Sequence, residues 1–413
     1  MNILTKNIRD LKFDDVVEFC KQQVLEGVQL DYKMTTPKDL AKHFASFSNT
    51  QGGLIIIGVE EDDKGLPTAH GGVPNDSKLV DRIHQFAANV TPLPTYDVCL
   101  TDEQKGNVFV LVRIYEGAAP PYTTTSDPTV WIRNGNISTS ASREELLRLA
   151  SKKREAAKTR GANAEFAEQY FKIRVGEAEI ERHNLVQAGE QNIYRHPLGN
   201  GNNSAILTIT IQPYYPDMKL VEPQELLRQL LEFCGSEYHQ TAFVNGRTDT
   251  LPGGIADFIW SKNQGTLNCA QLYANGLSYI AIDVLDFNKD TGVRDIKLIK
   301  ILSYLRSQLK LVQNYYGKLG YSGLVVGDIT LNGGQGAASV PLASSSRMFF
   351  PDSSVVRLPN YTWSFELDTN TLSDDAALTG QFVSLINEIS WGLGMSNVPN
   401  VVIDDVLKMN GWQ

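Results

Sequence analysis

Residues 26–61 read EGVQLDYKMTTPKDLAKHFASFSNTQGGLIIIGVEE, and this stretch decides the fold of the N-terminal part of the chain. We expect residues 28–33 to form a strand. Thr36 and Pro37 are typical of a helix N-cap and of the first helical position, so a helix should follow. After a pair of glycines, residues 54–59 are apolar without interruption, which indicates a strand covered on both faces. The stretch therefore predicts a strand, a helix and a second, buried strand.

Helical and strand-like patterns continue on both sides of this stretch. In the N-terminal part they predict helices at 14–25 and 77–88 and strands at 96–100, 108–115 and 129–133. Ser142 and Glu145 stand in capping-box register at the start of a further helix. In the C-terminal part they predict strands at 204–212, 277–284, 322–331 and 355–367, and helices at 222–233, 296–316 and 374–391. The predicted fold class is α+β, with a mixed sheet and flanking helices in the first domain.

The length of 413 residues suggests two or three domains. Residues 152–164 read KKREAAKTRGANA, a polar and charged segment of small residues that is typical of a helix tail running into a linker. We therefore expect a first domain at 1–155, a linker at 156–165, and a second α+β domain at 166–413. The second domain would serve assembly, sensing or positioning of a substrate.

The composition, 42% hydrophobic and 21% charged, is that of a globular chain and excludes a disordered or fibrous protein. No apolar run is long enough to span a membrane, and the N-terminus lacks the apolar core of a signal peptide, so we expect a cytoplasmic protein. The four cysteines are far apart, which argues against a zinc cluster or a disulfide framework. The net charge is -9, yet residues 1–160 hold 20 Lys and Arg against 21 Asp and Glu. The acidity lies in the C-terminal part, which leaves room for a basic groove in the first domain.

Three carboxylates and a lysine are the candidate catalytic residues: Glu26, Asp31, Lys33 and Glu61. Alternation along a strand places Asp31 and Lys33 on the same face. Glu26 lies at the turn before that strand and Glu61 just after the buried strand, so all four converge if the two strands are neighbours. Hard oxygen ligands suit Mg²⁺ or Mn²⁺, which activates water for attack on a phosphodiester. We predict Glu26, Asp31 and Glu61 as metal ligands, with Lys33 stabilising the developing anion.

Phosphate contacts dominate the affinity of proteins for nucleic acids, and basic side chains of the first domain are candidates for them. The candidates are Lys38, Lys42, His43, Arg133, Lys152, Lys153 and Arg154. Each of them alone also fits a solvated surface charge. The turn at residues 48–53 either approaches a phosphate with its glycines or caps a helix before the buried strand. Asn49 in this turn is a candidate to brace the acidic residues by hydrogen bonding.

Three blocks of the sequence together resemble the Schlafen AlbA-type domain, over about residues 15–150. The blocks are EGVQLDYK, LAKHFASFSNTQGGLIIIGVEE and VWIRNGN, followed by a closing helix. They are similar to the E-x-x-x-(L/V)-E-(F/Y)-K opening, the A-F-(A/S)-N-T-x-G-G-x-(L/I)-x-I-G-V-(D/E)-(D/E) centre and the aromatic-x-R-x-G strand of that family. Asp31 stands in place of the more usual glutamate, and Glu60 and Glu61 in place of two aspartates. The charges persist while the reach of the side chains changes.

This resemblance implies a module that binds nucleic acids. In the Schlafen branch it implies a metal-dependent endoribonuclease acting on structured RNA such as tRNA, with Glu26, Asp31 and Glu61 as its acidic triad and Lys33 beside them. In many bacterial relatives the domain is described as a DNA-binding or transcription-regulator module, and some relatives accompany antiviral defence systems. The resemblance therefore allows both catalysis and binding alone.

We predict an endonuclease that depends on Mg²⁺ or Mn²⁺, favours RNA over DNA and serves bacterial antiviral defence. The alternative is a non-catalytic DNA-binding regulator. A second alternative is an effector subunit that meets a partner protein through residues 166–413. The Schlafen ribonucleases build a basic trough from two such lobes, whereas this chain has one copy of the motif. We therefore also predict a homodimer or a higher oligomer.

Overall fold

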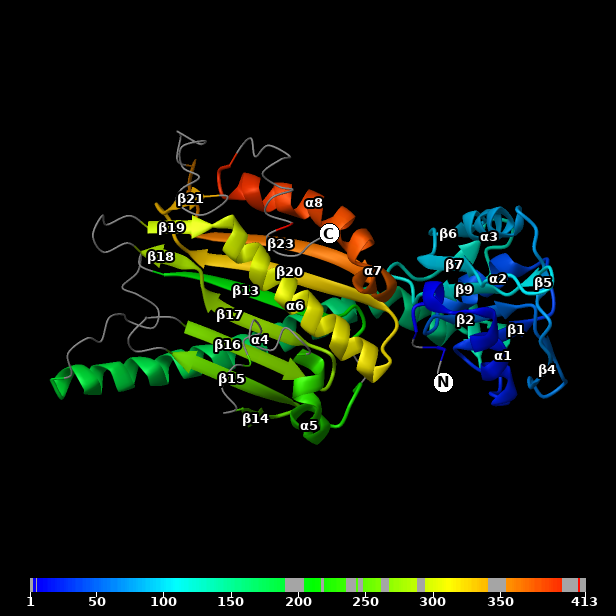
Figure 1. Cartoon of the computed structure of the whole chain (residues 1–413), viewed down its shortest axis with the longest axis horizontal. Coiled ribbons are helices and arrows are strands. Elements are labelled where there is room, and N and C mark those ends of the chain that lie inside the picture. The colour runs from blue at the N-terminus through cyan, green and yellow to red at the C-terminus, as the bar shows by residue number, and fades with distance from the viewer. Residues whose placement is uncertain are drawn as a thin grey trace. The chain divides into compact units, whose positions relative to one another are not determined.

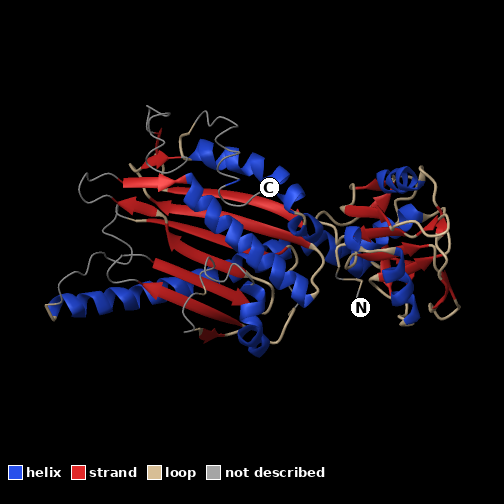
Figure 2. Cartoon of the chain, in the orientation of Figure 1, coloured by secondary structure: helices blue, strands red, loops and turns tan. Residues whose placement is uncertain are grey.

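The structure is a computed structural model that describes residues 3–4, 6–189, 204–216, 219–234, 243, 248–260, 267–287, 294–340, 354–395 and 408. The chain folds into two compact units (Figure 1). Unit 1 comprises Met1–Lys158 and Gly320–Leu324, and unit 2 comprises Thr159–Leu319 and Val325–Gln413. Both units combine helices and strands (Figure 2), which confirms the predicted α+β class.

A four-stranded mixed sheet is the centre of unit 1. Its order is β1 (Leu30–Lys33), β2 (Gly53–Ile57), β9 (Val110–Ile114) and β7 (Tyr96–Leu100). β1 is parallel to β2, whereas β9 runs antiparallel to both β2 and β7. The strand that holds Asp31 and Lys33 and the buried strand that precedes Glu61 are therefore neighbours, as the convergence of these residues requires. β1 lies at the edge of the sheet.

The remaining elements of unit 1 are helices and short strand pairs. Besides the first part of a long helix, its helices are η1 (Ile8–Asp10), α1 (Phe13–Lys21), α2 (Leu40–Ser48) and α3 (Leu79–Ala88). A hairpin forms from β11 (Trp131–Asn134) and β12 (Ile137–Ser140). The other pairs are β3 (Glu60–Glu61) with β4 (Pro67–Ala69), β5 (Val73–Pro74) with β8 (Asn107–Val108), and β6 (Val90–Thr91) with β10 (Thr123–Thr124).

Helices cover both faces of the sheet in unit 1. α1 packs on one face, while α2 and α3 pack on the other. Leu54 and Ile56 of β2 belong to the core under α1, whereas Ile55 and Ile57 belong to the core under α2 and α3. All four side chains are fully buried. The prediction that this strand is covered on both faces is therefore confirmed.

The helix that follows β1 starts later than the sequence predicted. Its N-cap residue is Asp39 and its first residue is Leu40. Thr36 and Pro37 precede a turn in which the Pro37 carbonyl accepts a hydrogen bond from the Leu40 N–H, at 3.3 Å. The assignment of Thr36 as N-cap was wrong, because this turn delays the helical backbone by about one helical turn.

A single long helix, α4 (Arg143–Gln187), replaces the predicted linker at 156–165. Its start was predicted correctly: the Ser142 N–H donates to Glu145 Oε2 at 2.7 Å, and the Glu145 N–H donates to Ser142 Oγ at 3.3 Å. The segment is rich in Ala, Lys, Arg and Glu, which favour helix. Gly161 costs about 1 kcal/mol relative to alanine, which a long helix tolerates. Helix propensity thus outweighs the polar, linker-like composition.

Among its described residues, unit 2 has a seven-stranded sheet, accompanied by a smaller sheet and four more helices. The large sheet has the order β14 (Asp249–Leu251), β15 (Gly254–Trp260), β16 (Leu267–Tyr273), β17 (Ser278–Asp283), β13 (Ala205–Pro213), β20 (Leu324–Gly333) and β23 (Asn360–Asp368). The smaller sheet has the order β18 (Leu285–Phe287), β19 (Arg294–Lys297), β21 (Ala338–Val340) and β22 (Ser354–Val355). The helices are α5 (Pro223–Cys234), α6 (Leu298–Leu319), α7 (Thr369–Ser373) and α8 (Asp375–Gly392).

α4 and α6 cover opposite faces of the large sheet (Figure 1). In β17, Tyr279 and Ala281 pack with Phe171 of α4. The neighbouring Ser278 accepts a hydrogen bond from Gln308 of α6, and successive residues of a strand point to opposite faces. The periodicity predicted β13, β17, β20 and β23 but missed β15 and β16. Within the described part of the chain, no helix is both long and apolar enough to cross a membrane.

Asn49 fastens the turn after α2 to the strands that follow. Its Nδ2 donates to the carbonyls of Tyr122 (2.8 Å) and Trp131 (2.9 Å), and its Oδ1 accepts from the Tyr122 N–H at 2.7 Å. Asn49→Ala should lower the free energy of unfolding of unit 1 by about 2–4 kcal/mol, because it leaves buried backbone groups unpaired. Urea denaturation measures this loss. Asn107→Ala, which removes one surface hydrogen bond, should cost less than about 1 kcal/mol; equal losses would contradict the prediction.

Candidate functional site

Three separate segments of unit 1 meet at one end of β1. Asp31 and Lys33 lie on β1 itself, Glu26 lies in the loop before it, and Glu61 lies on β3. The Lys33 carbonyl accepts a hydrogen bond from the N–H of Gly58, at 2.7 Å, where the chain leaves β2. Gly58 has a φ of 111°, and a Cβ there would lie 2.7 Å from the backbone of a neighbouring loop. Glycine thus permits the turn that brings Glu61 back beside β1.

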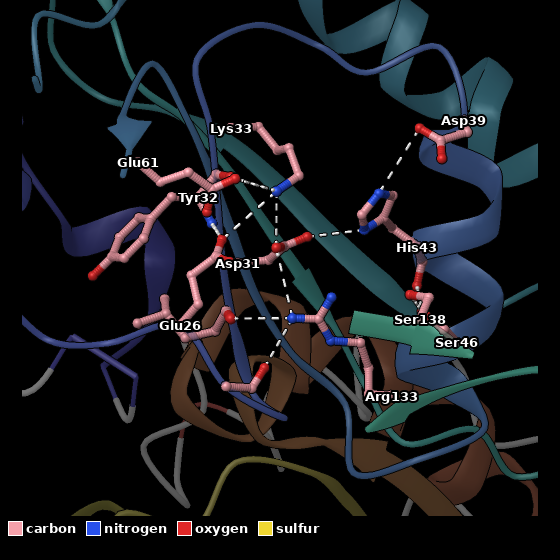
Figure 3. A network of polar contacts seen from close by, with 12 residues as sticks. Glu26, Asp31, Tyr32, Lys33, Asp39, His43, Ser46, Glu61, Arg133 and Ser138 are labelled. Carbon is pink, nitrogen blue, oxygen red and sulfur yellow. Dashed lines mark hydrogen bonds and ion pairs between the residues drawn. The ribbon is translucent and has the colours of Figure 1, made fainter. Parts of the chain in front are cut away.

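The Lys33 ammonium lies among the three carboxylates (Figure 3). Its Nζ is 2.9 Å from Asp31 Oδ1, 3.3 Å from Glu61 Oε1 and 3.6 Å from Glu26 Oε1. The side chains of Asp31 and Glu26 are 1% and 4% exposed, whereas those of Lys33 and Glu61 are 21% and 33% exposed. The structure therefore brings the four predicted residues together, and the cluster is open to solvent on the side of Glu61.

Asp31 has two further basic neighbours, which come from different elements. His43 of α2 places its Nδ1 2.8 Å from Asp31 Oδ2, outside hydrogen-bonding geometry. Arg133 of β11 places its Nη2 3.6 Å from Asp31 Oδ1 and donates to the Gly27 carbonyl at 2.9 Å. Burial alone would raise the pKa of Asp31, but His43, Lys33 and Arg133 together lower it below its ordinary value. Asp31 is therefore an ionised carboxylate.

Glu26 lies in the same cluster, but its pKa is raised where that of Asp31 is lowered. Its pKa is raised to about 9, chiefly by burial and further by hydrogen bonds with the Glu61 and Asp31 carboxyls. The Tyr32 N–H, which donates to Glu26 Oε1 at 2.5 Å, opposes this rise. Burial would lower the pKa of Lys33, yet the contacts with Asp31, Glu26 and Glu61 raise it overall. At neutral pH the cluster thus holds a protonated Glu26 beside an ionised Asp31 and a charged lysine.

A pocket of about 440 Å³ lies beside the cluster, and its lining is acidic. Its carboxylates outnumber its Lys and Arg side chains two to one. The carboxylates are those of Glu26, Asp31, Asp39, Glu61, Asp62 and Asp63, and the cations are those of Lys33, Lys42 and Arg133, with His43 beside them. Such a surface repels a phosphodiester unless cations are bound. The chemistry that the pocket suits best is therefore the binding of cations together with an anion.

The predicted nucleic-acid contacts separate into two groups. Lys42 and Arg133 line the pocket, whereas Lys38, Lys152 and Lys153 do not. Lys42 Nζ lies 3.9 Å from the centroid of the Trp131 ring, while the Arg133 side chain is 1% exposed and turned toward Asp31. Lys152 donates to the Thr50 carbonyl at 3.2 Å and pairs with Glu116, so it fastens α4 to the sheet. Lys38 and Lys153 are exposed.

His43 and Asn49 make contacts that the sequence did not predict. His43, a candidate for a phosphate contact, lines the pocket, and its 13% exposed side chain also contacts Asp31. The signal was available, because His43 lies three residues after Leu40 and four before Phe47, at the edge of the buried helix face. Asn49 was expected to brace the acidic residues, and instead it binds backbone groups of Tyr122 and Trp131. No local pattern indicates that long-range partnership.

An acidic cluster with a central lysine, set at the edge of a mixed sheet, defines the site. Residues 26–142 match the model of the Schlafen, AlbA_2 family, so unit 1 contains a Schlafen AlbA-type domain. This match supports a function related to nucleic acids. The solution NMR structure of the N-terminal domain of a RecG-related protein from Nitrosomonas europaea is similar at 20% identity, over 32% of this chain and 93% of that one, with a TM-score of 0.24. No curated protein matches the chain.

The protonated Glu26 gives the stability of unit 1 a defined pH dependence in the absence of metal. Its pKa in the folded state is about 9, above the ordinary 4.5 of the unfolded chain. Between about pH 5 and about pH 9 the unfolded chain releases a proton that the folded protein keeps, so the contribution of Glu26 to stability falls as pH rises. Glu26→Gln lacks this group, and its stability relative to wild type should increase with pH across the window.

Hydrogen exchange of the Gly53–Ile57 amides, measured by mass spectrometry in EDTA, follows this difference when wild type and Glu26→Gln are compared at each pH. Glu60→Gln is the control for an exposed carboxylate nearby. A difference between Glu26→Gln and wild type that stays constant with pH would show that Glu26 is ionised in the folded protein.

Proposed function

We propose that unit 1 is a metal-dependent phosphodiester hydrolase, an endonuclease that favours RNA over DNA. The observation that carries this proposal is the convergence of Glu26, Asp31 and Glu61, from three separate segments, on one point beside an acidic pocket. The family match of residues 26–142 adds the link to nucleic acids. Carboxylates gathered in this way are the usual ligands of Mg²⁺ or Mn²⁺ in enzymes that hydrolyse phosphodiesters.

The donor chemistry of the cluster fits such an ion. Glu61 Oε2 is a buried oxygen without a hydrogen-bond partner, and Asp31 Oδ2 contacts the His43 ring at 2.8 Å outside hydrogen-bonding geometry. Hard oxygens are what Mg²⁺ and Mn²⁺ prefer. Within the described residues no group of three acidic, His or Cys side chains is already arranged as ligands. Figure 3 shows that the Lys33 ammonium lies between the carboxylates. Glu26, Asp31 and Glu61 are the residues that would hold the ion.

The chain's own residues have separate tasks in this proposal. Arg133 and His43 fix the carboxylate of Asp31 from two sides, so its oxygens keep one orientation. Lys33 lines the pocket and would supply positive charge beside a phosphate bound there. Glu26 holds a proton in the resting cluster. A bound divalent ion would polarise the scissile phosphate and lower the pKa of a water molecule.

The acidic lining leads to a second expectation about binding. Lys33 and Arg133 are both engaged by Asp31, which leaves Lys42 as the pocket cation that faces no carboxylate of the cluster. Nucleic acid should therefore bind more tightly with Mn²⁺ or Mg²⁺ than in EDTA, because the ions offset the repulsion between phosphate and carboxylates.

The cluster has an alternative function that a specific observation favours. Lys33, His43 and Arg133 surround Asp31 so closely that the group also fits an ion-pair network that only stabilises the fold. In that case unit 1 is a non-catalytic DNA-binding regulator. A role in antiviral defence, a homodimer or higher oligomer, and a partner protein bound through residues 166–413 stay proposals of the same kind, since they rest on the resemblance and on the acidic charge of the C-terminal part.

The decisive experiment incubates labelled tRNA, single-stranded RNA, single-stranded DNA and duplex DNA with the full chain in Mn²⁺, Mg²⁺ or EDTA. We expect metal-dependent cleavage, fastest on RNA. The triple variant Glu26→Gln/Asp31→Asn/Glu61→Gln should lose more than about 100-fold in rate, the upper end of the effect of groups that only support a metal ligand. Glu60→Gln, on the same strand as Glu61, should cleave normally.

The same proteins distinguish the alternative by their binding. If all four substrates stay intact and nucleic acid binds equally in Mn²⁺ and in EDTA, unit 1 is a regulator and the catalytic proposal is wrong. If the triple variant binds nucleic acid in EDTA more tightly than wild type does, the carboxylates face the phosphates, as the endonuclease requires.

A further inference from the structure

We infer that Lys33 is a built-in counter-ion that competes with divalent cations for the Glu26, Asp31 and Glu61 cluster and so sets its metal affinity. This inference rests on the proposed function, since it concerns the same three carboxylates. It reverses the role predicted from the sequence, in which Lys33 only assists a metal already in place. In the structure, the Lys33 ammonium occupies the position that a divalent ion bound by the three carboxylates would need.

The distances support direct competition. Lys33 Nζ lies within 3.6 Å of one oxygen from each of the three carboxylates, and it also donates to the Tyr32 carbonyl at 2.6 Å. An ammonium has three donors, and here they are directed to acceptors on several sides at once. A divalent ion such as Mg²⁺, which would take carboxylate oxygens as ligands at about 2.0–2.1 Å, would leave no room for the ammonium among them.

The surroundings of the cluster allow a divalent ion to replace the Lys33 ammonium. Glu61 is 33% exposed and Lys33 21% exposed, so the cluster is reached from solvent on that side. The adjoining pocket of about 440 Å³ gives the flexible lysine side chain a place to move. Asp31 keeps Arg133 and His43 as neighbours when the ammonium leaves, because they approach it from other elements. The displaced Lys33 would then face the pocket in which a phosphate is expected.

Lys42 supplies a matched control for this inference. It lines the same pocket and carries the same charge, but its Nζ lies 3.9 Å from the centroid of the Trp131 ring instead of among the carboxylates. Removing either charge makes the pocket more negative by one unit. Only the loss of Lys33 vacates the position that the metal needs. A comparison of the two lysines therefore separates direct competition from the general electrostatic field.

The experiment measures Mn²⁺ binding to the full chain by electron paramagnetic resonance. Lys33→Met and Lys33→Gln should bind Mn²⁺ at least about tenfold more tightly than wild type, because a unit charge about 3 Å from the ligands is removed. Lys42→Met should gain much less, and the triple variant Glu26→Gln/Asp31→Asn/Glu61→Gln should not bind. Melting curves check folding: both Lys33 variants should melt below wild type in EDTA and gain more from Mn²⁺ than wild type gains.

The outcomes distinguish this inference from the proposed function. If wild type binds Mn²⁺ and neither Lys33 variant binds more tightly, the ammonium organises the carboxylates instead of competing, and the inference is overturned while the proposed function stands. An equal gain in Lys42→Met also overturns it, because the field of the pocket then explains the effect. If no Mn²⁺ binds to wild type or to either Lys33 variant, the inference and the metal-dependent function fail together.

Discussion

The burial of one carboxylate, Asp31, is the constraint on which the site depends. A buried charge is tolerated only when it is paired, and Asp31 at 1% exposure has Lys33, His43 and Arg133 around it. These partners come from β1, α2 and β11, so three elements must keep their positions for the fold to be stable. Arg133 also donates to the carbonyl of Gly27, beside Glu26. One ion-paired carboxylate thereby fixes both the strand and the loop before it.

The turn after α2 extends this constraint to the rest of unit 1. Thr50 Oγ1 accepts a hydrogen bond from the Arg133 N–H at 2.9 Å, and Asn49 binds the Trp131 carbonyl. These two bonds fix the position of β11 relative to the turn after α2. They thereby direct the Arg133 guanidinium toward Asp31. Lys152 donates to the Thr50 carbonyl and joins the start of α4 to the same turn. The hydrophobic cores give the layers of the unit, while these polar bonds determine where the site's side chains meet.

The sequence predicted features that are encoded within a few neighbouring residues. It did not predict contacts between residues far apart in the chain. The apolar run of β2, the polar alternation of β1 and the capping box at Ser142 and Glu145 carry their information within a few residues, and the structure confirms each. The convergence of the acidic residues also followed, because only one assumption about neighbouring strands was needed. Partners about 80 residues apart, such as Asn49 with Trp131, leave no such pattern. The predicted linker at 156–165 is helical because the same residues combine a linker-like composition with high helix propensity, and the division between the two units falls within it.

The energetics of the cluster favour a functional over a purely structural origin. An ion pair between Asp31 and Arg133 would be enough to satisfy the buried charge, and neither Glu26 nor Glu61 is needed for it. Glu26, at 4% exposure beside Asp31, has a pKa raised to about 9, chiefly by burial, so an ionised Glu26 would be destabilising at neutral pH. Unfavourable placement of titratable groups in a pocket is typical of sites that bind or react. A cation of higher charge than Lys33 would offset the cost of ionising Glu26 more completely, and this is the physical reason for expecting one.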